Sequence, residues 1–167
     1  DDPVRKGDAG RDLTMFTVVL FEPEIPPNTG NLMRLTVNTG CTLHLIEPLG
    51  FTLDDARMRR AGLDYRDFAD VMVHPSFPTF LETVEPETMY AFSQHGDTLY
   101  TDVAYREGDT LLFGRESDGL PADILHHPRV TERLRIPIAP KGRSLNLANA
   151  AAIGVYEAWR QHGFRTP

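Results

Sequence analysis

Short apolar runs recur along this chain, and stretches with helical periodicity separate them. The first run, Phe16-Thr17-Val18-Val19-Leu20-Phe21, is almost continuously apolar, which is typical of a parallel strand buried on both faces. No hairpin signal joins one run to the next, so the pattern predicts an α/β domain with a mostly parallel sheet flanked by helices. Strands are expected at Phe16–Phe21, Thr42–Ile46, Phe68–Val73, Thr88–Phe92, Asp109–Phe113 and Leu134–Ile138, and helices at Thr29–Thr39, Asp54–Arg60, Phe77–Val84 and Asn146–His162.

The length of 167 residues fits one domain. Residues 1–14 are polar and lack apolar periodicity. We interpret them as a disordered extension or an added remnant, with the domain at 15–167 and Met15 as the natural start. The one cysteine, Cys41, excludes an internal disulfide and a cysteine-rich zinc module, and we expect it to pack in the core.

Charge and hydropathy narrow the function classes. The net charge of −7 argues against a protein that coats nucleic acid non-specifically, although a local basic site remains compatible with it. No apolar run approaches the roughly 20 residues that cross a bilayer, and no apolar segment typical of a signal peptide lies near the N-terminus, so a cytoplasmic location is expected. Metal binding is not expected, because His126-His127 has no third ligand spaced with it. His44 alternates with Leu43 and Leu45 and is expected on the opposite face of its strand.

The first loop motif, Pro27-Asn28-Thr29-Gly30-Asn31-Leu32-Met33-Arg34, follows the first strand. Asn28 is a good N-cap for the helix, and Gly40 can close it. Asn31 and Arg34 are three residues apart and project from one helix face. From the residues alone, a binding site and a capped helix with an ordinary surface arginine are equally compatible with this pattern.

The second motif is Gly114-Arg115-Glu116-Ser117-Asp118-Gly119, which follows the strand at Asp109–Phe113. Ligands of parallel sheets bind outside the carboxyl ends of the strands. Glycine lets the backbone approach a ligand closely there. A common glycine-containing turn is the alternative.

The third motif is Ile136-Pro137-Ile138 followed by Arg143-Ser144-Leu145-Asn146-Leu147-Ala148-Asn149-Ala150. Ser144 or Asn146 can cap the last helix. Asn149 lies inside that helix, where asparagine is disfavoured, so a specific hydrogen bond is expected for it. The alternative is an N-cap followed by an ordinary core helix.

Together the three motifs resemble the SPOUT superfamily of RNA methyltransferases. The narrower resemblance is to its small single-domain branch, the tRNA (cytidine/uridine-2′-O-)-methyltransferases of the wobble nucleotide, and it covers roughly Met15 to Gly163. The segments Glu22–Asn31 and Arg59–Tyr65 strengthen it. Asp118 departs from the pattern by replacing a basic residue, and Ala148 replaces a serine.

The resemblance implies a fold with a C-terminal deep trefoil knot whose loops bind S-adenosylmethionine, with S-adenosylhomocysteine as product. The residues that would bind the cofactor are Phe92, Ser93, Gln94, Gly114, Arg115, Glu116, Gly119, Ile136, Ile138, Ser144, Leu145 and Asn146. It also implies a homodimer with Tyr156 and Trp159 on the last helix at the interface. Plain core packing of these two side chains is the alternative from sequence.

The implied reaction is methyl transfer to a ribose 2′-hydroxyl of the wobble nucleotide of tRNA. The resemblance assigns the catalytic site to Arg34, Asn31, Ser144 and Asn149. We expect Arg34 to orient a phosphate and the hydroxyl, because an arginine holds its proton above about pH 12. RNA would be held by Arg57, Arg59, Arg60, Arg66, Lys141 and Arg143. The alternatives are the same chemistry on another RNA, such as ribosomal RNA, and an inactive protein that binds cofactor or RNA.

Overall fold

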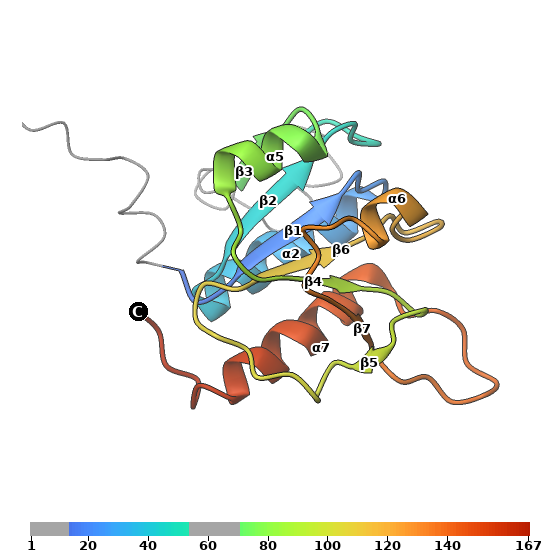
Figure 1. The fold of residues 1–167 in the computed structure, drawn as a ribbon. Coiled ribbons are helices and arrows are strands. Elements are labelled where there is room, and N and C mark those ends of the chain that lie inside the picture. The colour runs from blue at the N-terminus through green and yellow to red at the C-terminus, as the bar shows by residue number, and fades with distance from the viewer. Residues whose placement is uncertain (1–13, 54–70) are drawn as a thin grey trace, which may run out of the picture.

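The computed structural model describes residues 14–53 and 71–167, and its centre is a seven-stranded sheet (Figure 1). The strand order is β3-β2-β1-β6-β4-β7-β5, and every pairing between these strands is parallel. The predicted mostly parallel α/β sheet is therefore confirmed. The strands are β1 Thr17–Phe21, β2 Thr42–Ile46, β3 Val71–His74, β4 Met89–Phe92, β5 Thr98–Leu99, β6 Thr110–Phe113 and β7 Glu132–Arg135, and the helices are α2 Pro26–Thr39, α5 Phe77–Val84, α6 Ala122–Leu125 and α7 Leu147–Arg160.

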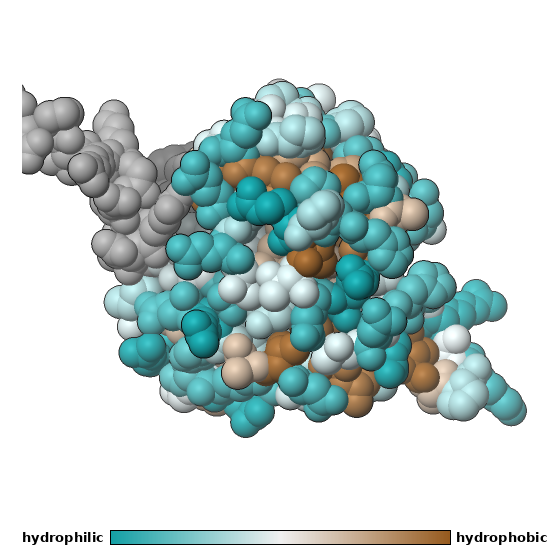
Figure 2. All heavy atoms as spheres, in the orientation of Figure 1, coloured by the Kyte–Doolittle hydropathy of each residue, from teal (hydrophilic) through white to brown (hydrophobic). Residues whose placement is uncertain are grey.

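Helices cover both faces of the sheet because successive strand residues point to opposite sides. In β1, Val18 and Leu20 belong to the core shared with α2 and α7, whereas Val19 and Phe21 belong to the core shared with α5 and α6. Helices α2 and α7 also pack against each other. On the face shown in Figure 2, mostly hydrophilic side chains cover these cores, and hydrophobic side chains show between them.

The start of α2 differs from the prediction that Asn28 is its N-cap. The helix begins at Pro26, and Ile25 is the N-cap residue without a side-chain cap. Proline is favoured in the first helical turn because its missing N–H is not needed there, so Pro26 and Pro27 move the start forward. The predicted C-terminal glycine is confirmed, since Gly40 has φ 71° and its N–H donates to the carbonyls of Thr36 and Val37.

The strand predicted at Leu134–Ile138 lies earlier in the chain, at Glu132–Arg135. Pro137 lacks the N–H that a ladder needs, so the chain leaves the sheet at Ile136. The prediction also missed β5 and α6, which have two and four residues. Neither is long enough to show a periodicity.

Several single-residue expectations can be compared with the structure. His44 lies on the α5 side of β2, opposite Leu43 and Leu45, as predicted. Cys41 packs against the α2–α7 core, where burial raises the pKa of its thiol. Thr14, which the prediction placed in the extension, is buried and donates to the carbonyl of Phe16. The expected helix at Asp54–Arg60 and residues 1–13 lie outside the described residues. None of the described helices could span a membrane.

Candidate active site

A cavity of about 200 Å³ opens at the carboxyl ends of β4, β6 and β7. Three loops line it, and they are the loops that follow these strands. All the residues expected to bind the cofactor line the cavity except Asn146. Seven further residues, which were not expected to bind the cofactor, also line it: His95, Phe113, Ser117, Asp118, Leu120, Leu147 and Ala150.

Two stacked aromatic rings form the apolar wall of the cavity. The rings of Phe92 and Phe113 lie 4.6 Å apart between centroids, at an interplanar angle of 23°. Gly154 on α7 supports them from behind, because a Cβ built there would lie 3.0 Å from the Phe92 ring. The packing of α7 therefore fixes the position of this wall.

The loop between β6 and α6 is closed on itself and needs glycine at both ends. Arg115 and Gly119 exchange backbone hydrogen bonds of 3.1 and 2.9 Å. A Cβ on Gly114 would lie 2.2 Å from the backbone of Gly119, and Gly119 itself has φ 70°. The two glycines of the second motif are thus required by the backbone, and they leave room for a ligand to approach it.

Glu116 lines the cavity, and its carboxylate is hydrogen-bonded to the start of α2. Its carboxylate accepts from the backbone N–H groups of Glu24, at 2.9 Å, and Ile25, at 2.5 Å. The Nδ2 of Asn28 lies 3.4 Å from the same carboxylate. A carboxylate at a helix N-terminus also interacts favourably with the helix dipole. Glu116 therefore joins the cavity loop to α2.

Asn28 continues this connection to the third motif. Its Oδ1 accepts from the Nδ2 of Asn146 at 3.0 Å. The Oδ1 of Asn146 in turn accepts from the N–H groups of Ala148 and Asn149, which caps α7. Of the two cap candidates, the cap is therefore Asn146 and not Ser144, which lines the cavity instead. The three motifs form one hydrogen-bonded unit, and Asn28 is its central residue.

The four residues expected to be catalytic do not all reach the cavity of their own chain. Ser144 lines it, whereas Asn31 and Arg34 lie on the exposed side of α2. Asn149 is exposed, and its side chain has no hydrogen-bond partner among the described residues. The bond predicted for it is therefore not made among the described residues, where the Asn146 side chain makes the cap.

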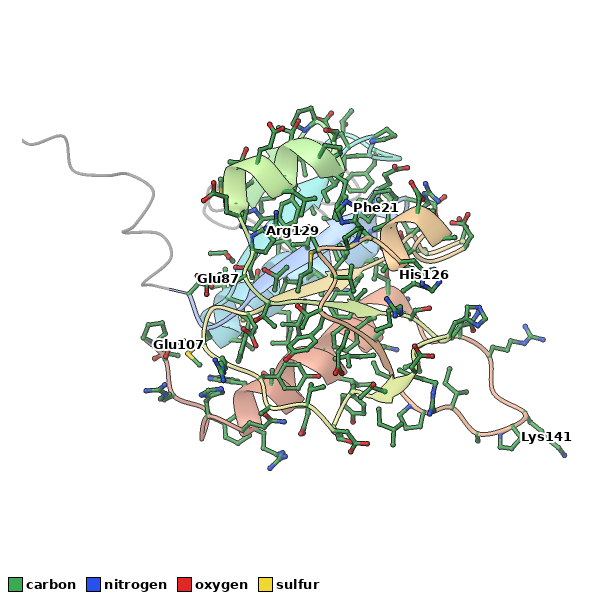
Figure 3. All side chains as sticks on the ribbon, viewed as in Figure 1. Phe21, Glu87, Glu107, His126, Arg129 and Lys141 are labelled. Carbon is green, nitrogen blue, oxygen red and sulfur yellow. The ribbon has the colours of Figure 1, made fainter. Side chains whose placement is uncertain are left out.

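The charged residues that line the cavity are Arg115, Glu116 and Asp118, and two basic residues lie in the loop that contains Ile138 and Ser144. Lys141 and Arg143 are exposed in the loop before α7, and Figure 3 shows Lys141 at the far tip of that loop. Arg115 lies between Glu22, at 2.9 Å, and Asp118, at 3.4 Å. The other predicted RNA-binding residues, Arg57, Arg59, Arg60 and Arg66, lie outside the described residues.

The two residues expected at a dimer interface lie near the end of α7. Tyr156 is 43% exposed, and Trp159 is half-buried and donates from Nε1 to the carbonyl of Arg165. Their rings are in edge contact. Within residues 14–53 and 71–167, no three His, Cys, Asp or Glu side chains gather where they could hold a metal ion.

Comparisons with known proteins agree with this architecture. The profile of the SpoU rRNA Methylase family matches residues 15–156. A protein of Saccharophagus degradans named tRNA (cytidine(34)-2′-O)-methyltransferase is 55% identical over 150 residues, which cover 90% of this chain and 97% of that protein. The protein of the same name from Escherichia coli K12 is 51% identical over 150 residues, with 90% and 96% covered.

Solved structures give the same result. One described as giving insight into the 2-OH methylation of C/U34 on tRNA has a TM-score of 0.82 and 45% identity, with 90% of this chain and 92% of that chain covered. The SpoU methyltransferase AviRb of Streptomyces viridochromogenes, in complex with AdoMet, has a TM-score of 0.77 and 26% identity, with 89% and 61% covered.

Proposed function

The chain belongs to the SpoU rRNA Methylase family, and on that premise we propose that it methylates the ribose 2′-hydroxyl of nucleotide 34, the wobble nucleotide, of tRNA. The methyl donor is S-adenosylmethionine, and S-adenosylhomocysteine is the second product. The observation that carries the proposal is the single unit formed by the three motif loops around the cavity, in a chain 51% to 55% identical to relatives of that activity. A tRNA substrate also favours a cytoplasmic location.

The residues of the cavity fit this cofactor. The Phe92–Phe113 wall offers apolar and aromatic surface for a nucleoside. A Cβ on Gly119 would meet no atom within 4 Å, so the backbone of the loop is open to a ligand there. Loops that follow parallel strands bind nucleotides in many α/β proteins. When bound, the cofactor supplies an electrophilic methyl group on a sulfonium, and the protein supplies alignment and charge stabilisation.

The side chains of α2 then act on the RNA. With the cofactor bound, the 2′-hydroxyl oxygen would take the methyl group from the sulfonium, and the hydroxyl proton would leave to solvent. Arg34 orients a phosphate and the hydroxyl through its planar fork of donors. Asn31 and Asn149 support the ribose, and Ser144 contacts cofactor or RNA.

Local basic residues hold the RNA despite the acidic chain. Lys141 and Arg143 are exposed in the loop between Ile138 and Ser144, which both line the cavity. The sequence also contains Arg57, Arg59, Arg60 and Arg66, which we expect to contact the RNA as well. The anticodon loop presents unstacked bases, which RNA-binding proteins recognise most readily. Binding of this kind weakens steeply as the salt concentration rises.

A second copy of the chain would complete the site. Arg34 lies on the exposed side of α2 and does not line the cavity of its own chain. Three apolar side chains on or beside the paired helices α2 and α7 are exposed, namely Val37 at 56%, Tyr156 at 43% and Phe164 at 52%. An α2–α7 interface would cover them and bring Arg34 to the partner's cavity. Analytical ultracentrifugation should give a dimer, and Tyr156→Glu should shift it towards monomer with loss of methyl transfer.

The family's trefoil knot also belongs to the proposal. It rests on the family to which the chain belongs. At the end of α7, Gln161 bonds to the backbone of Val103 and Tyr105, and His162 bonds to the carbonyl of Tyr105. The segment between β5 and β6 thus lies against the C-terminal end of the helix.

The test is methyl transfer from labelled S-adenosylmethionine to tRNA that lacks 2′-O-methylation at nucleotide 34, with the labelled nucleotide mapped. Label at the ribose of nucleotide 34 is expected, and Arg34→Ala should abolish it. Arg129→Ala is the control, because Arg129 is exposed and contacts the carbonyl of Pro86 (Figure 3). The same assay is run with ribosomal RNA. Label on ribosomal RNA alone would show that the substrate is not tRNA, and cofactor binding without transfer to either RNA would indicate an inactive binding protein.

A further inference from the structure

Three consecutive residues of the cavity loop are joined to the segment that leads into α2. Arg115 donates from Nε and Nη2 to Glu22, at 3.2 and 2.9 Å. Glu116 accepts from the backbone of Glu24 and Ile25. Ser117 donates from its backbone N–H and its hydroxyl to the Oε1 of Glu24, at 3.0 and 2.7 Å. Side chains of each segment therefore form hydrogen bonds with the other segment.

The Glu24–Ser117 contact is short and charge-assisted. Hydrogen bonds to a carboxylate are about twice as strong as neutral ones. The two bonds from Ser117 hold the pKa of the Glu24 carboxyl below its usual value. Glu24 lies two residues before the first residue of α2, and Ser117 lines the cavity. This contact thus links the wall of the cavity to the start of the helix that carries Asn31 and Arg34.

The backbone of Glu24 has little freedom to move away from this contact. A Cβ on Gly50 would lie 2.9 Å from the Cα and the carbonyl oxygen of Glu24. The N–H of Gly50 also donates to the carbonyl of Pro23 at 3.0 Å. With Gly50 on one side and Glu116 on the other, a displacement of the cavity loop is passed to α2 rather than absorbed by the connecting segment.

We propose that Glu24 and Ser117 are positioning residues that couple occupancy of the cavity to the order of α2. The proposal rests on the proposed function for the identity of the ligand. A cofactor that fixes the loop at 114–119 also fixes the first turns of α2, where Asn31 and Arg34 meet the RNA. By thermodynamic linkage, RNA that fixes α2 tightens cofactor binding by the same factor.

The experiment compares hydrogen exchange of the amides at 30–34 with and without S-adenosylhomocysteine, in wild type, Ser117→Ala, Ser117→Thr and Glu24→Gln. Affinity for the same compound is measured by calorimetry. In wild type the compound should slow exchange at 30–34 at least fivefold. Ser117→Ala and Glu24→Gln should reduce this effect to less than twofold and weaken affinity about threefold to tenfold, whereas Ser117→Thr keeps the hydroxyl and both properties.

Glu107→Gln is the matched control. Glu107 is an exposed carboxylate paired with Arg165 at 2.9 Å, and Figure 3 shows it at the end of the molecule opposite Lys141. This variant should behave as wild type in both measurements. Unfolding midpoints of all variants establish that the comparison is made between folded proteins.

The outcomes separate the two proposals. If the compound slowed exchange equally in wild type, Ser117→Ala and Glu24→Gln, the coupling would be overturned. The coupling would also be overturned if the bound compound left exchange at 30–34 unchanged in wild type. Wild type that binds the compound but methylates no tRNA would overturn the proposed function alone. Absence of any binding by wild type would overturn both.

Discussion

Asn28 uses both ends of its amide, since Nδ2 lies 3.4 Å from the carboxylate of Glu116 and Oδ1 accepts from Asn146 at 3.0 Å. Asn28→Asp keeps the shape but removes the donor and places two carboxylates side by side. We expect the free energy of unfolding to fall by about 1–3 kcal/mol at pH 7, because a hydrogen bond to a charged group is replaced by repulsion. Urea denaturation measures this loss.

The pH dependence of this variant separates repulsion from a packing defect. The loss should shrink at acid pH, where one carboxyl of the pair becomes protonated. Asn38→Asp on the exposed side of the same helix is the control and should change stability by about 0.5 kcal/mol or less. A loss that stays constant with pH would contradict the assigned contact with Glu116.

At the residue scale, the motifs could be identified from the sequence, but the hydrogen bonds made by each asparagine could not. Asn28 and Asn146 are both good caps by type, yet only Asn146 caps a helix. Pro26 and Pro27 begin α2 before Asn28 is reached, which leaves its amide for contacts 88 and 118 residues away. Local propensity cannot predict bonds at that separation, so Asn28 was missed as a residue of the site.

At the scale of elements, Gly154 decides how closely α7 approaches the cavity wall. Gly154→Ala would place a methyl group 3.0 Å from the Phe92 ring, which is already stacked on Phe113. Alanine gains about 1 kcal/mol of helix propensity, and overpacking costs about 1–3 kcal/mol. We expect a net loss of stability and a severalfold weaker affinity for S-adenosylhomocysteine by calorimetry. Unchanged affinity would show that this wall does not meet the cofactor.

Elements whose ends are marked by local sequence signals were predicted well. Elements whose ends depend on contacts elsewhere in the fold were not. Helix α5 lies at its predicted bounds, Phe77–Val84, and the structure shows that the Ser76 hydroxyl caps it and that Pro78 lies in its first turn. Strand β7 was predicted too late, because Ile136 and Ile138 are apolar enough for a strand but line the cavity instead. Apolar residues that face a ligand cannot be told from core residues by pattern alone.

At the scale of the whole molecule, the fold class could be predicted from the alternation of apolar runs and helical stretches, because each of these segments has its own local periodicity. The strand order could not, because the pairing of β1 with β6 joins segments far apart in the chain. The proposed dimer and knot are also long-range properties. They were expected only from the family resemblance.

The stability of the whole fold should depend on a buried histidine pair between β2 and β3. His44 and His74 are 5% and 4% exposed, and Nδ1 of His44 lies 2.8 Å from Nε2 of His74. Burial and the neighbouring His74 lower the pKa of His44 to about 4, and burial also lowers the pKa of His74. An unfolded histidine has a pKa of about 6.5, so the unfolded chain binds more protons between these values.

Stability from the neutral pair is therefore complete above about pH 6.5 and is lost as the pH falls towards 4. We expect the free energy of unfolding to drop by about 2 kcal/mol between pH 7 and pH 4.5 from His44 alone. Asp109 has the opposite sign, because burial raises the pKa of its carboxyl and favours the folded state at low pH. Urea denaturation across this range should give a flatter profile for His44→Leu/His74→Phe, since removal of both polar partners leaves no buried group to protonate. An equally steep profile in the double variant would place the acid sensitivity elsewhere in the molecule.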